Sequence, residues 1–383
     1  MLSLSKKDFG SFSENIKMKT ILIAHNYTES SFAFMSYYLA QSLSNDGNRV
    51  IFISHKPFFS KPFKEIIGKG ELLICSWPTE NRPVKISDAL WYAKIYLKYK
   101  PSVVISHFVS VNITTIISKI FSLRKVNTFP YYHTLSSQIN EDVLTSSLKR
   151  NFKKYRKKLL YRWFADLVIC PSDLAKEDLE KYFECQNSIK VLNPMKDRFN
   201  GKVDPDPNSI IISYLGRLEP SKGVIELIDA FLTYKSKFQM SKIRLKIAGS
   251  GSQYDQILKL SNTHNDINFK GALSYNEIDQ YLNKSHYAIV PSKFDNLPTV
   301  GLESMMNQTP LLISNNTGLA KELEDGVECF KFDPTLEEMI LLFEKVENNL
   351  ENYIEMGIEA RKTYLKKFGI DSYCTTMKKI IEN

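Results

Sequence analysis

Short apolar segments that alternate with longer amphipathic ones constrain the fold of this chain most strongly. In the first half, the apolar segments are rich in Ile, Val or aromatic residues and are too short for helices, so each predicts a β-strand. They lie at 20–25, 49–54, 71–76, 102–108, 128–133 and 166–172. Helix-like segments separate them, at 31–45, 86–99, 111–122 and 147–164. Continuous apolar strands separated by helices indicate parallel strands that are covered on both faces.

A proline-rich segment, NPMKDRFNGKVDPDPNS at 193–209, interrupts this alternation. Proline removes a backbone donor and disfavours helix in the residue before it, so the segment is predicted to be a linker. Alternation then resumes, with predicted strands at 209–216, 243–249, 267–271, 287–292, 310–314 and 328–332. We therefore expect an α/β protein of two doubly wound, Rossmann-like parallel-sheet domains that face each other across a cleft.

Composition narrows the class of protein. The chain has 383 residues, of which 43% are hydrophobic and 24% charged, as is typical of soluble globular proteins. No apolar run is long enough to span a membrane, and the first residues lack the apolar core of a signal peptide, so we expect a cytoplasmic protein. Five scattered cysteines without a CxxC pair indicate reduced thiols rather than a zinc site or a disulfide framework.

The two halves differ in charge. Residues 1–204 carry a formal charge of +13, whereas residues 205–383 carry −4. The first half should therefore attract anionic partners such as lipid headgroups, phosphorylated carriers or nucleic acid.

The segment YLGRLEPSKGVIELIDAF (214–231) has the pattern of a phosphate-binding turn. A predicted strand ends at Gly216, the loop contains Arg217 and Lys222, and a helix follows from about Gly223. The N-terminus of a helix offers free N–H groups and partial positive charge, and two flanking cations could hold a diphosphate. The spacing is not that of a Walker loop. A surface turn with solvated cations is the alternative.

The segment PSKFDNLPTVGLESMMNQTP (291–310) contains two carboxylates beside a predicted buried strand. We expect Asp295 in the loop after the strand, Glu303 within a helix, and the intervening N–H groups facing the cleft. A carboxylate accepts hydrogen bonds from vicinal hydroxyls, so the pair could hold a hydroxyl-rich phosphate ester. Alternatively, Asp295 caps the helix and Glu303 is solvated, although the apolar neighbours of Glu303 weaken this interpretation.

Together these segments resemble the retaining nucleotide-sugar glycosyltransferases of family 4, which have the two-domain GT-B fold. The resemblance is strong over 210–334, where the segments above are followed by GVECFKFDP, and looser over 164–199. It implies that Arg217 and Lys222 contact the donor diphosphate, that Asp295 lies beside the donor sugar and that Glu303 binds the nucleotide ribose. The predicted donor-binding residues are Gly216, Arg217, Lys222, Asp295, Asn296, Leu297, Pro298, Thr299 and Glu303. The Asp at 295 departs from the Glu that is more usual in the family.

Predictions for the first domain are less specific. His133 ends a predicted strand and resembles the family histidine near the donor sugar and acceptor, while His107 is a competing candidate. A lone histidine is more often structural. The glycine-rich loop of the family is absent from AHNYTESSF (24–32). Either Thr28, Ser30 and Ser31 bind phosphate there, or this domain contributes less to donor binding.

The segment 149–162 has eight cations and no acid, with apolar residues at three- and four-residue steps. Such a helix could lie on an anionic membrane or bind a polyprenyl-phosphate-linked acceptor. The alternative is a helix packed on the core with a solvated basic face. Nucleic acid binding is disfavoured because no recognition motif accompanies the charge.

The resemblance predicts transfer of a hexose-type sugar from a UDP- or GDP-sugar to a glycan or lipid-linked acceptor, in bacterial surface polysaccharide synthesis, without metal or cofactor. His133, Arg217, Lys222 and Asp295 are the predicted catalytic residues. We expect an acceptor-binding domain at 1–198, a donor-binding domain at 199–366 and a final helix at 367–383 that packs on the first domain. A catalytically inactive sugar-nucleotide-binding protein, an inverting GT-B enzyme and an epimerase remain alternatives.

Overall fold

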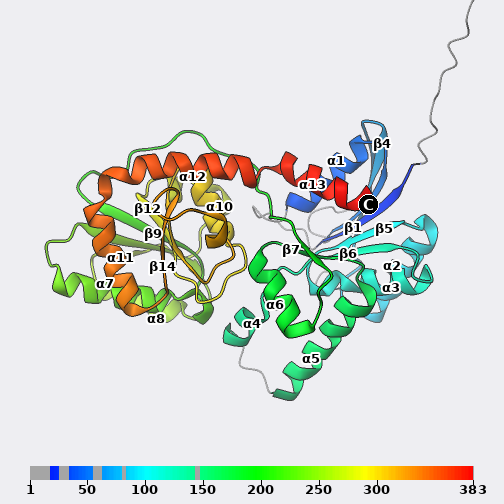
Figure 1. Ribbon diagram of the computed structural model, residues 1–383, viewed down its shortest axis with the longest axis horizontal. Coiled ribbons are helices and arrows are strands. Elements are labelled where there is room, and N and C mark those ends of the chain that lie inside the picture. Colours follow the sequence, from blue (N-terminus) through cyan, green and yellow to red (C-terminus); the bar gives the residue numbers. More distant parts are fainter. Residues whose placement is uncertain (1–17, 26–33, 55–62, 80–82, 143–146, 383) are drawn as a thin grey trace, which may run out of the picture.

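Two α/β domains lie side by side in the computed structural model (Figure 1). The structure describes residues 18–25, 34–54, 63–79, 83–142 and 147–382. The predicted linker joins the two domains. In this described stretch, no helix or strand lies between the end of β8 (Ser188–Lys190), in the first domain, and the start of β9 (Ile210–Arg217), in the second.

The first domain contains a six-stranded sheet in the order β3-β4-β2-β1-β5-β6. Its strands are β1 (Thr20–Ala24), β2 (Arg49–Ser54), β3 (Phe63–Ile67), β4 (Gly70–Ser76), β5 (Val103–Ser106) and β6 (Asn127–Pro130). All pair in parallel except β3, which forms an antiparallel hairpin with β4 at the edge. The sequence analysis missed β3 because this exposed edge strand, FKEII, mixes charged and apolar residues.

The helices of this domain are α1 (Phe34–Asn45), α2 (Ile86–Tyr99), α3 (Ile113–Phe121), α4 (Ser136–Asp142), α5 (Ser147–Leu159) and α6 (Asp173–Phe183). Helix α1 packs on one face of the six-stranded sheet, and α2 and α3 pack on the other. Helix α6 packs beside β7 (Val168–Cys170) and β8, and α4 and α5 pack against α6. The strand β7 pairs in parallel with β8 as a small second sheet, and a bridge between Tyr131 and Ile169 continues it from β6. The sequence analysis predicted β7 and did not predict β8.

The second domain contains a wholly parallel sheet in the order β11-β10-β9-β12-β13-β14. Its further strands are β10 (Ile243–Ser250), β11 (Ile267–Phe269), β12 (Tyr287–Val290), β13 (Leu311–Ser314) and β14 (Cys329–Phe332). Its helices are α7 (Val224–Lys237), α8 (Tyr254–Thr263), α9 (Tyr275–Asn283), α10 (Thr299–Met306), α11 (Leu336–Asn348) and α12 (Tyr353–Lys367). Every strand predicted in this half is present.

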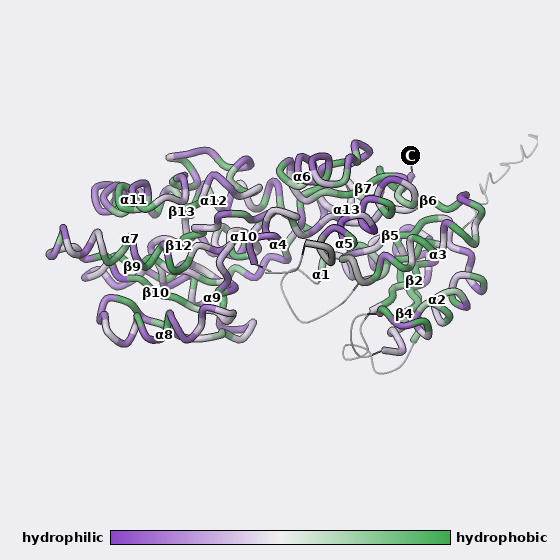
Figure 2. The backbone as a smooth tube through the Cα atoms, turned by 90° about the horizontal axis from the view of Figure 1, so that it is seen from below, coloured by the Kyte–Doolittle hydropathy of each residue, from purple (hydrophilic) through white to green (hydrophobic). Residues whose placement is uncertain are grey.

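Apolar side chains on alternate strand positions enter different cores. Ile21 and Ile23 belong to the cluster on one face of the first sheet, and Leu22 and Ala24 to the cluster on the other. The second sheet likewise has one cluster on each face. Figure 2 shows green stretches along the strands and purple stretches on the helices around them. Continuous apolar strands therefore follow from burial on both faces, as predicted.

The last helix, α13 (Ile370–Glu382), returns from the second domain to the first and packs against α1 (Figure 1). The hydroxyl of Tyr373 lies 2.6 Å from that of Tyr131, and Met377 and Ile381 belong to the core of the first sheet. The chain thus crosses between the domains twice, at the linker and between α12 and α13. None of the helices in the described part of the chain is long and apolar enough to cross a bilayer.

The basic helix α5 and the π-helical turn that follows it (Leu160–Phe164) present aromatic side chains to solvent. Phe152, Tyr155 and Trp163 are 63%, 59% and 58% exposed, whereas Leu160 is buried. The alternative of a helix packed on the core therefore fits Leu160 and does not fit these three aromatic residues. The side chains of Lys149 and Arg150 lie outside the described part of the structure.

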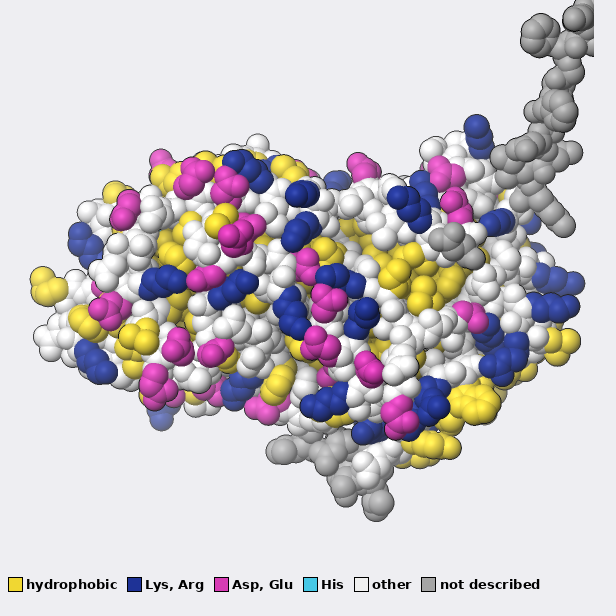
Figure 3. Space-filling view, in the orientation of Figure 1, with side chains coloured by type: hydrophobic (Ala, Val, Ile, Leu, Met, Phe, Trp, Pro, Cys, Tyr) yellow, Lys and Arg dark blue, Asp and Glu magenta, His cyan; other side chains and the backbone are white. Residues whose placement is uncertain are grey.

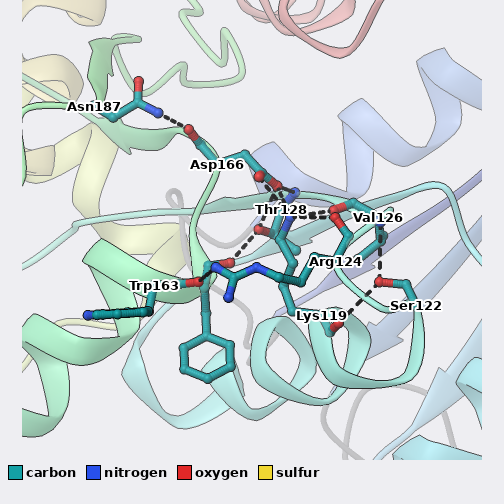
Figure 4. Close-up of polar contacts among 9 residues, drawn as sticks. Lys119, Ser122, Arg124, Val126, Thr128, Trp163, Asp166 and Asn187 are labelled. Atoms are coloured by element: carbon teal, nitrogen blue, oxygen red, sulfur yellow. Dashed lines mark hydrogen bonds and ion pairs between the residues drawn. The ribbon is translucent and has the colours of Figure 1, made fainter.

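A polar network fixes the end of this helical segment to the sheet (Figure 4). Nζ of Lys119 lies 2.6 Å from a carboxylate oxygen of Asp166, which also accepts a 2.7 Å hydrogen bond from the N–H of Thr128. Arg124 donates to the carbonyl oxygen of Trp163 at 2.6 Å, in the π-helical turn Leu160–Phe164 that follows α5. Arg124, in the loop after α3, and Thr128 of β6, whose hydroxyl donates to the carbonyl oxygen of Phe164 at 2.6 Å, thereby hold the turn in place.

Candidate active site

A cleft of about 770 Å³ opens between the two domains, beyond the carboxyl ends of β9 and β12. This is where ligands bind in open parallel sheets. The cleft brings together all ten predicted site residues, namely His133, Gly216, Arg217, Lys222, Asp295, Asn296, Leu297, Pro298, Thr299 and Glu303. Their individual roles remain predictions.

The turn after β9 places two cations at the cleft. Arg217 ends the strand, a short 3-10 turn covers Pro220–Lys222, and α7 begins directly after Gly223. Gly223 has φ +68°, and a Cβ built on it would lie 2.3 Å from the carbonyl oxygen of Pro291. Only glycine fits this left-handed position and close approach. The tight turn brings Lys222 against the loop that follows β12.

Lys222 and Asp295 form an ion pair on the cleft wall. Their Nζ and Oδ2 atoms are 2.5 Å apart, and each side chain is 12% exposed. The backbone of Asp295 is fixed because its carbonyl oxygen accepts a 3.0 Å hydrogen bond from the N–H of Gly318. The alternative in which Asp295 caps a helix is wrong, since α10 starts after Pro298 without a side-chain cap among the described residues.

Glu303 lies in the second turn of α10 and is 4% exposed, so the alternative of a solvated carboxylate is also wrong. Its Oε1 lies 3.8 Å from Nη2 of Arg198. Arg198 is held by a two-pronged contact to Asp279, at 2.8 and 2.9 Å, and its guanidinium lies 4.8 Å from the ring centre of Tyr275. The sequence analysis missed Arg198, which comes from the linker.

The side chain of Asn296 contacts the first domain. Its Nδ2 donates to the carbonyl oxygen of His133 at 2.8 Å, and its Oδ1 accepts from the hydroxyl of Ser172 at 2.5 Å. The side chain is buried by these contacts. The side chain of Asn296 therefore joins the two domains.

His133 and His107 lie together at the first domain's side of the cleft. Nε2 of His133 is 3.2 Å from Nδ1 of His107, whose ring stacks on Tyr131 with centres 4.1 Å apart. Burial holds the pKa of both histidines well below the usual value, so both are neutral at neutral pH. His133 lines the cleft, whereas His107 is packed behind it.

Helix α4 brings oxygen atoms of the first domain to the cations of the second. Asp142 Oδ2 lies 3.5 Å from both terminal nitrogens of Arg217, and its Oδ1 accepts a 3.0 Å hydrogen bond from the N–H of Ser221. The amide oxygen of Gln138, once its amide is oriented to face the cations, accepts from Arg217 at 2.8 Å and from Lys222 at 3.2 Å. No local motif marks these two residues, so the sequence analysis missed them.

The cleft lining combines three kinds of group. Arg217 and Lys222 supply cations of the kind that bind phosphate. Asp295, paired with Lys222, and Glu303 supply carboxylate oxygens that can accept from hydroxyls, and apolar residues such as Leu273 also line the cleft. Thr28, Ser30 and Ser31, the other candidates for phosphate binding, lie outside the described residues.

Family models match both halves of the chain. The model described as "Glycosyltransferase Family 4" matches residues 34–195, and that described as "Glycosyl transferases group 1" matches residues 195–363. An uncharacterised glycosyltransferase of Methanocaldococcus jannaschii is 27% identical over 63% of this chain and 65% of its own length. Glycogen synthase of Mycobacterium tuberculosis is 32% identical over 30% of this chain and 29% of its own length. The chain thus spans less than two thirds of these curated relatives.

Solved structures match nearly the whole chain. Sucrose-phosphate synthase from Thermosynechococcus elongatus has a TM-score of 0.73 at 13% identity, with 95% of this chain and 98% of that chain covered. Anabaena HepE, solved in complex with UDP-glucose, has a TM-score of 0.69 at 14% identity, with 95% and 99% covered. At these identities the likeness establishes the fold alone, and it confirms the fold predicted from the sequence.

Proposed function

Because this chain belongs to the group 1, family 4 glycosyltransferases and has their GT-B fold, we propose that it transfers a hexose-type sugar from a nucleotide diphosphate donor, with retention of the anomeric configuration. Residues 199–366 bind the donor in this proposal, and residues 1–198 bind the acceptor, with the helix at 367–383 completing the first domain. The acceptor is a glycan or a lipid-linked saccharide of bacterial surface polysaccharide synthesis.

One observation supports the proposal most directly, namely the Lys222–Asp295 pair beside Arg217 in the cleft between the domains. Cleavage of the sugar–phosphate bond leaves negative charge on the diphosphate. Arg217 and Lys222 neutralise this charge without a metal ion. Asp295 meets the hydroxyls of the sugar, and Glu303 meets those of the ribose.

The acceptor hydroxyl attacks the sugar on the face that the diphosphate leaves. The bond between the sugar carbon and the diphosphate oxygen breaks as the new glycosidic bond forms, and the diphosphate takes the acceptor proton. Asp295 is paired with Lys222 at 2.5 Å, which favours a positioning role over a nucleophilic one. His133 is neutral, so it serves as a hydrogen-bond partner for the sugar or acceptor.

The donor is a UDP- or GDP-sugar. Two relatives favour a hexose: glycogen synthase by its name, and Anabaena HepE by its complex with UDP-glucose. A thermal-shift panel of UDP, GDP, ADP and their sugar esters tests donor binding. A ligand at about 100 times its Kd should add about 2.7 kcal/mol of stability, or about 5–11 °C in Tm. If every member leaves Tm unchanged, the proposal is wrong.

Product analysis by NMR separates the alternatives. Retention of configuration in the transferred sugar supports the proposal. Inversion would indicate an inverting enzyme, and an altered sugar in the recovered donor would indicate an epimerase. Donor binding without transfer or hydrolysis across a panel of acceptors would indicate a catalytically inactive binding protein.

The protein associates with an anionic membrane through α5. Its cations lie beside the exposed rings of Phe152, Tyr155 and Trp163, and Figure 3 shows hydrophobic and basic side chains together at the lower edge of the first domain. Rings enter the interface while cations meet anionic headgroups, at about 1 kcal/mol per cation near the surface.

Co-sedimentation with vesicles tests this surface. The protein should pellet with phosphatidylglycerol vesicles and less with phosphatidylcholine vesicles, and F152S/Y155S/W163S should reduce the bound fraction at least tenfold. The variant L258S/L341S, which replaces exposed leucines on the second domain, is the matched control. Equal binding by the aromatic variant and the wild-type protein would exclude α5 as the contact.

A further inference from the structure

Asp142 contacts two groups at the cleft that could otherwise bind phosphate. Its two oxygens contact a guanidinium, that of Arg217, and a backbone N–H at the start of a helical turn, that of Ser221. Both are groups that bind phosphate in other proteins. The side chain of Asp142 is 10% exposed, whereas that of Arg217 is 55% exposed, so the carboxylate is largely buried and the guanidinium is still reached by water. An anion of the first domain thus holds the diphosphate site of the second.

Other contacts of α4 reinforce this arrangement. Gln138, one turn earlier, presents its amide oxygen to Arg217 and Lys222. Glu141 lies 3.3 Å from Lys293 of the second domain, outside the cleft lining. The helix therefore brings three oxygen-bearing side chains to the cations of the second domain. Gln138 lines the cleft but is uncharged, Glu141 is charged but lies outside the lining, and Asp142 is both charged and part of the lining.

We propose that Asp142 is an internal competitor of the diphosphate, which weakens donor binding and promotes release of the nucleoside diphosphate product. The inference rests on the proposed function. A diphosphate on Arg217 would bring its oxygens close to the carboxylate of Asp142, so the two anions repel. The effect differs between substrate and product, because bond cleavage converts a diphosphate diester into a monoester with one more ionisable oxygen. The carboxylate therefore opposes the product more strongly than the donor.

The substitution Asp142→Asn tests the charge alone. Asparagine keeps an oxygen that can accept from the N–H of Ser221, so the fold and the end of α4 should be preserved. Glu141→Gln is the matched control, since it removes the neighbouring interdomain charge that faces Lys293 instead of Arg217. Titration calorimetry with UDP, GDP and inorganic pyrophosphate gives the affinities, and the Tm of each variant checks its folding.

We expect D142N to bind the cognate nucleoside diphosphate and pyrophosphate at least about fourfold more tightly than the wild type or E141Q does. A carboxylate charge about 5 Å from a charge on the ligand repels it by this amount even at the dielectric of water, and D142N lacks that charge. The gain should be larger for the nucleoside diphosphate than for its sugar ester, and should shrink at high salt. Wild-type binding with equal or weaker binding by D142N would overturn this inference and leave the proposed function standing. If neither protein bound any nucleotide or pyrophosphate, both would be refuted.

Discussion

Replacement of Lys222 by Met should destabilise the protein as well as abolish transfer. The Nζ atom of Lys222 lies 2.5 Å from Asp295 Oδ2, and each side chain is only 12% exposed. Removal of one member of a buried ion pair costs about 3–5 kcal/mol, because the other charge stays in a poorly solvated place. Water in the cleft reaches Asp295, so we expect about 2–3 kcal/mol here, or a fall of about 4–12 °C in Tm.

The double variant K222M/D295N separates stability from function. It removes both charges, so its Tm should lie above that of K222M, while transfer remains lost in both. Lys293→Met is the control, since its side chain is 30% exposed and its pair with Glu226 should be worth less than about 1 kcal/mol. Differential scanning calorimetry and a donor-turnover assay give the two readouts. A double variant no more stable than K222M would refute the reasoning, as would full turnover by either variant.

Three further predictions concern groups around the site and the core. Burial and the charge of Lys202 lower the pKa of His286 to about 4, so the histidine is neutral in the folded protein. The stability that this neutral form contributes is complete above the ordinary pKa of about 6.5 and is lost as pH falls toward 4, by up to about 1.4 kcal/mol per pH unit. Urea titrations over this pH range should show a smaller loss of unfolding free energy in H286N than in the wild type. If Arg198 positions Glu303 for the ribose, Arg198→Gln should weaken binding of the nucleotide about tenfold and should change binding of its 2′,3′-dideoxy analogue little. Calorimetry that shows an equal loss of affinity for both ligands would refute this role. Gly223→Ala should lower the unfolding free energy by more than about 2 kcal/mol, because φ +68° and the nearby carbonyl oxygen of Pro291 disfavour any Cβ there. Urea titrations that show a loss below about 0.5 kcal/mol would contradict this geometry.

Much of the fold could be predicted because its determinants are local. A parallel strand that is buried on both faces is apolar along most of its length, so segments such as RVIFIS at 49–54 and PLLIS at 310–314 can be recognised in the sequence. The helix over 299–306 and the turn around Gly223 were also predictable, since each depends on residues within a few positions. The candidate site residues from Gly216 to Glu303 came from the same short segments, and they meet at one edge of one sheet.

The contacts between distant segments could not be predicted in this way. Asp142 meets Arg217 across 75 positions, and Asn296 reaches His133 across 163. Arg198 meets Glu303 only because the linker folds back over α9 and α10. These side chains have no pattern that distinguishes them from solvated polar residues. Their partners become visible only when the two domains are placed together.

These contacts give the two carboxylates of 291–310 a common physical meaning. Asp295 has Lys222 as its counter-ion, and Glu303 has Arg198 nearby. Arg217, the other cation in the described lining of the cleft, lies 3.5 Å from Asp142. Each of these charges thus lies within 3.8 Å of a charge of opposite sign. Binding of the donor proposed above would exchange these internal partners for phosphate and hydroxyl oxygens at hydrogen-bonding distance. In that proposal, each internal pair is a determinant of how tightly the donor is held.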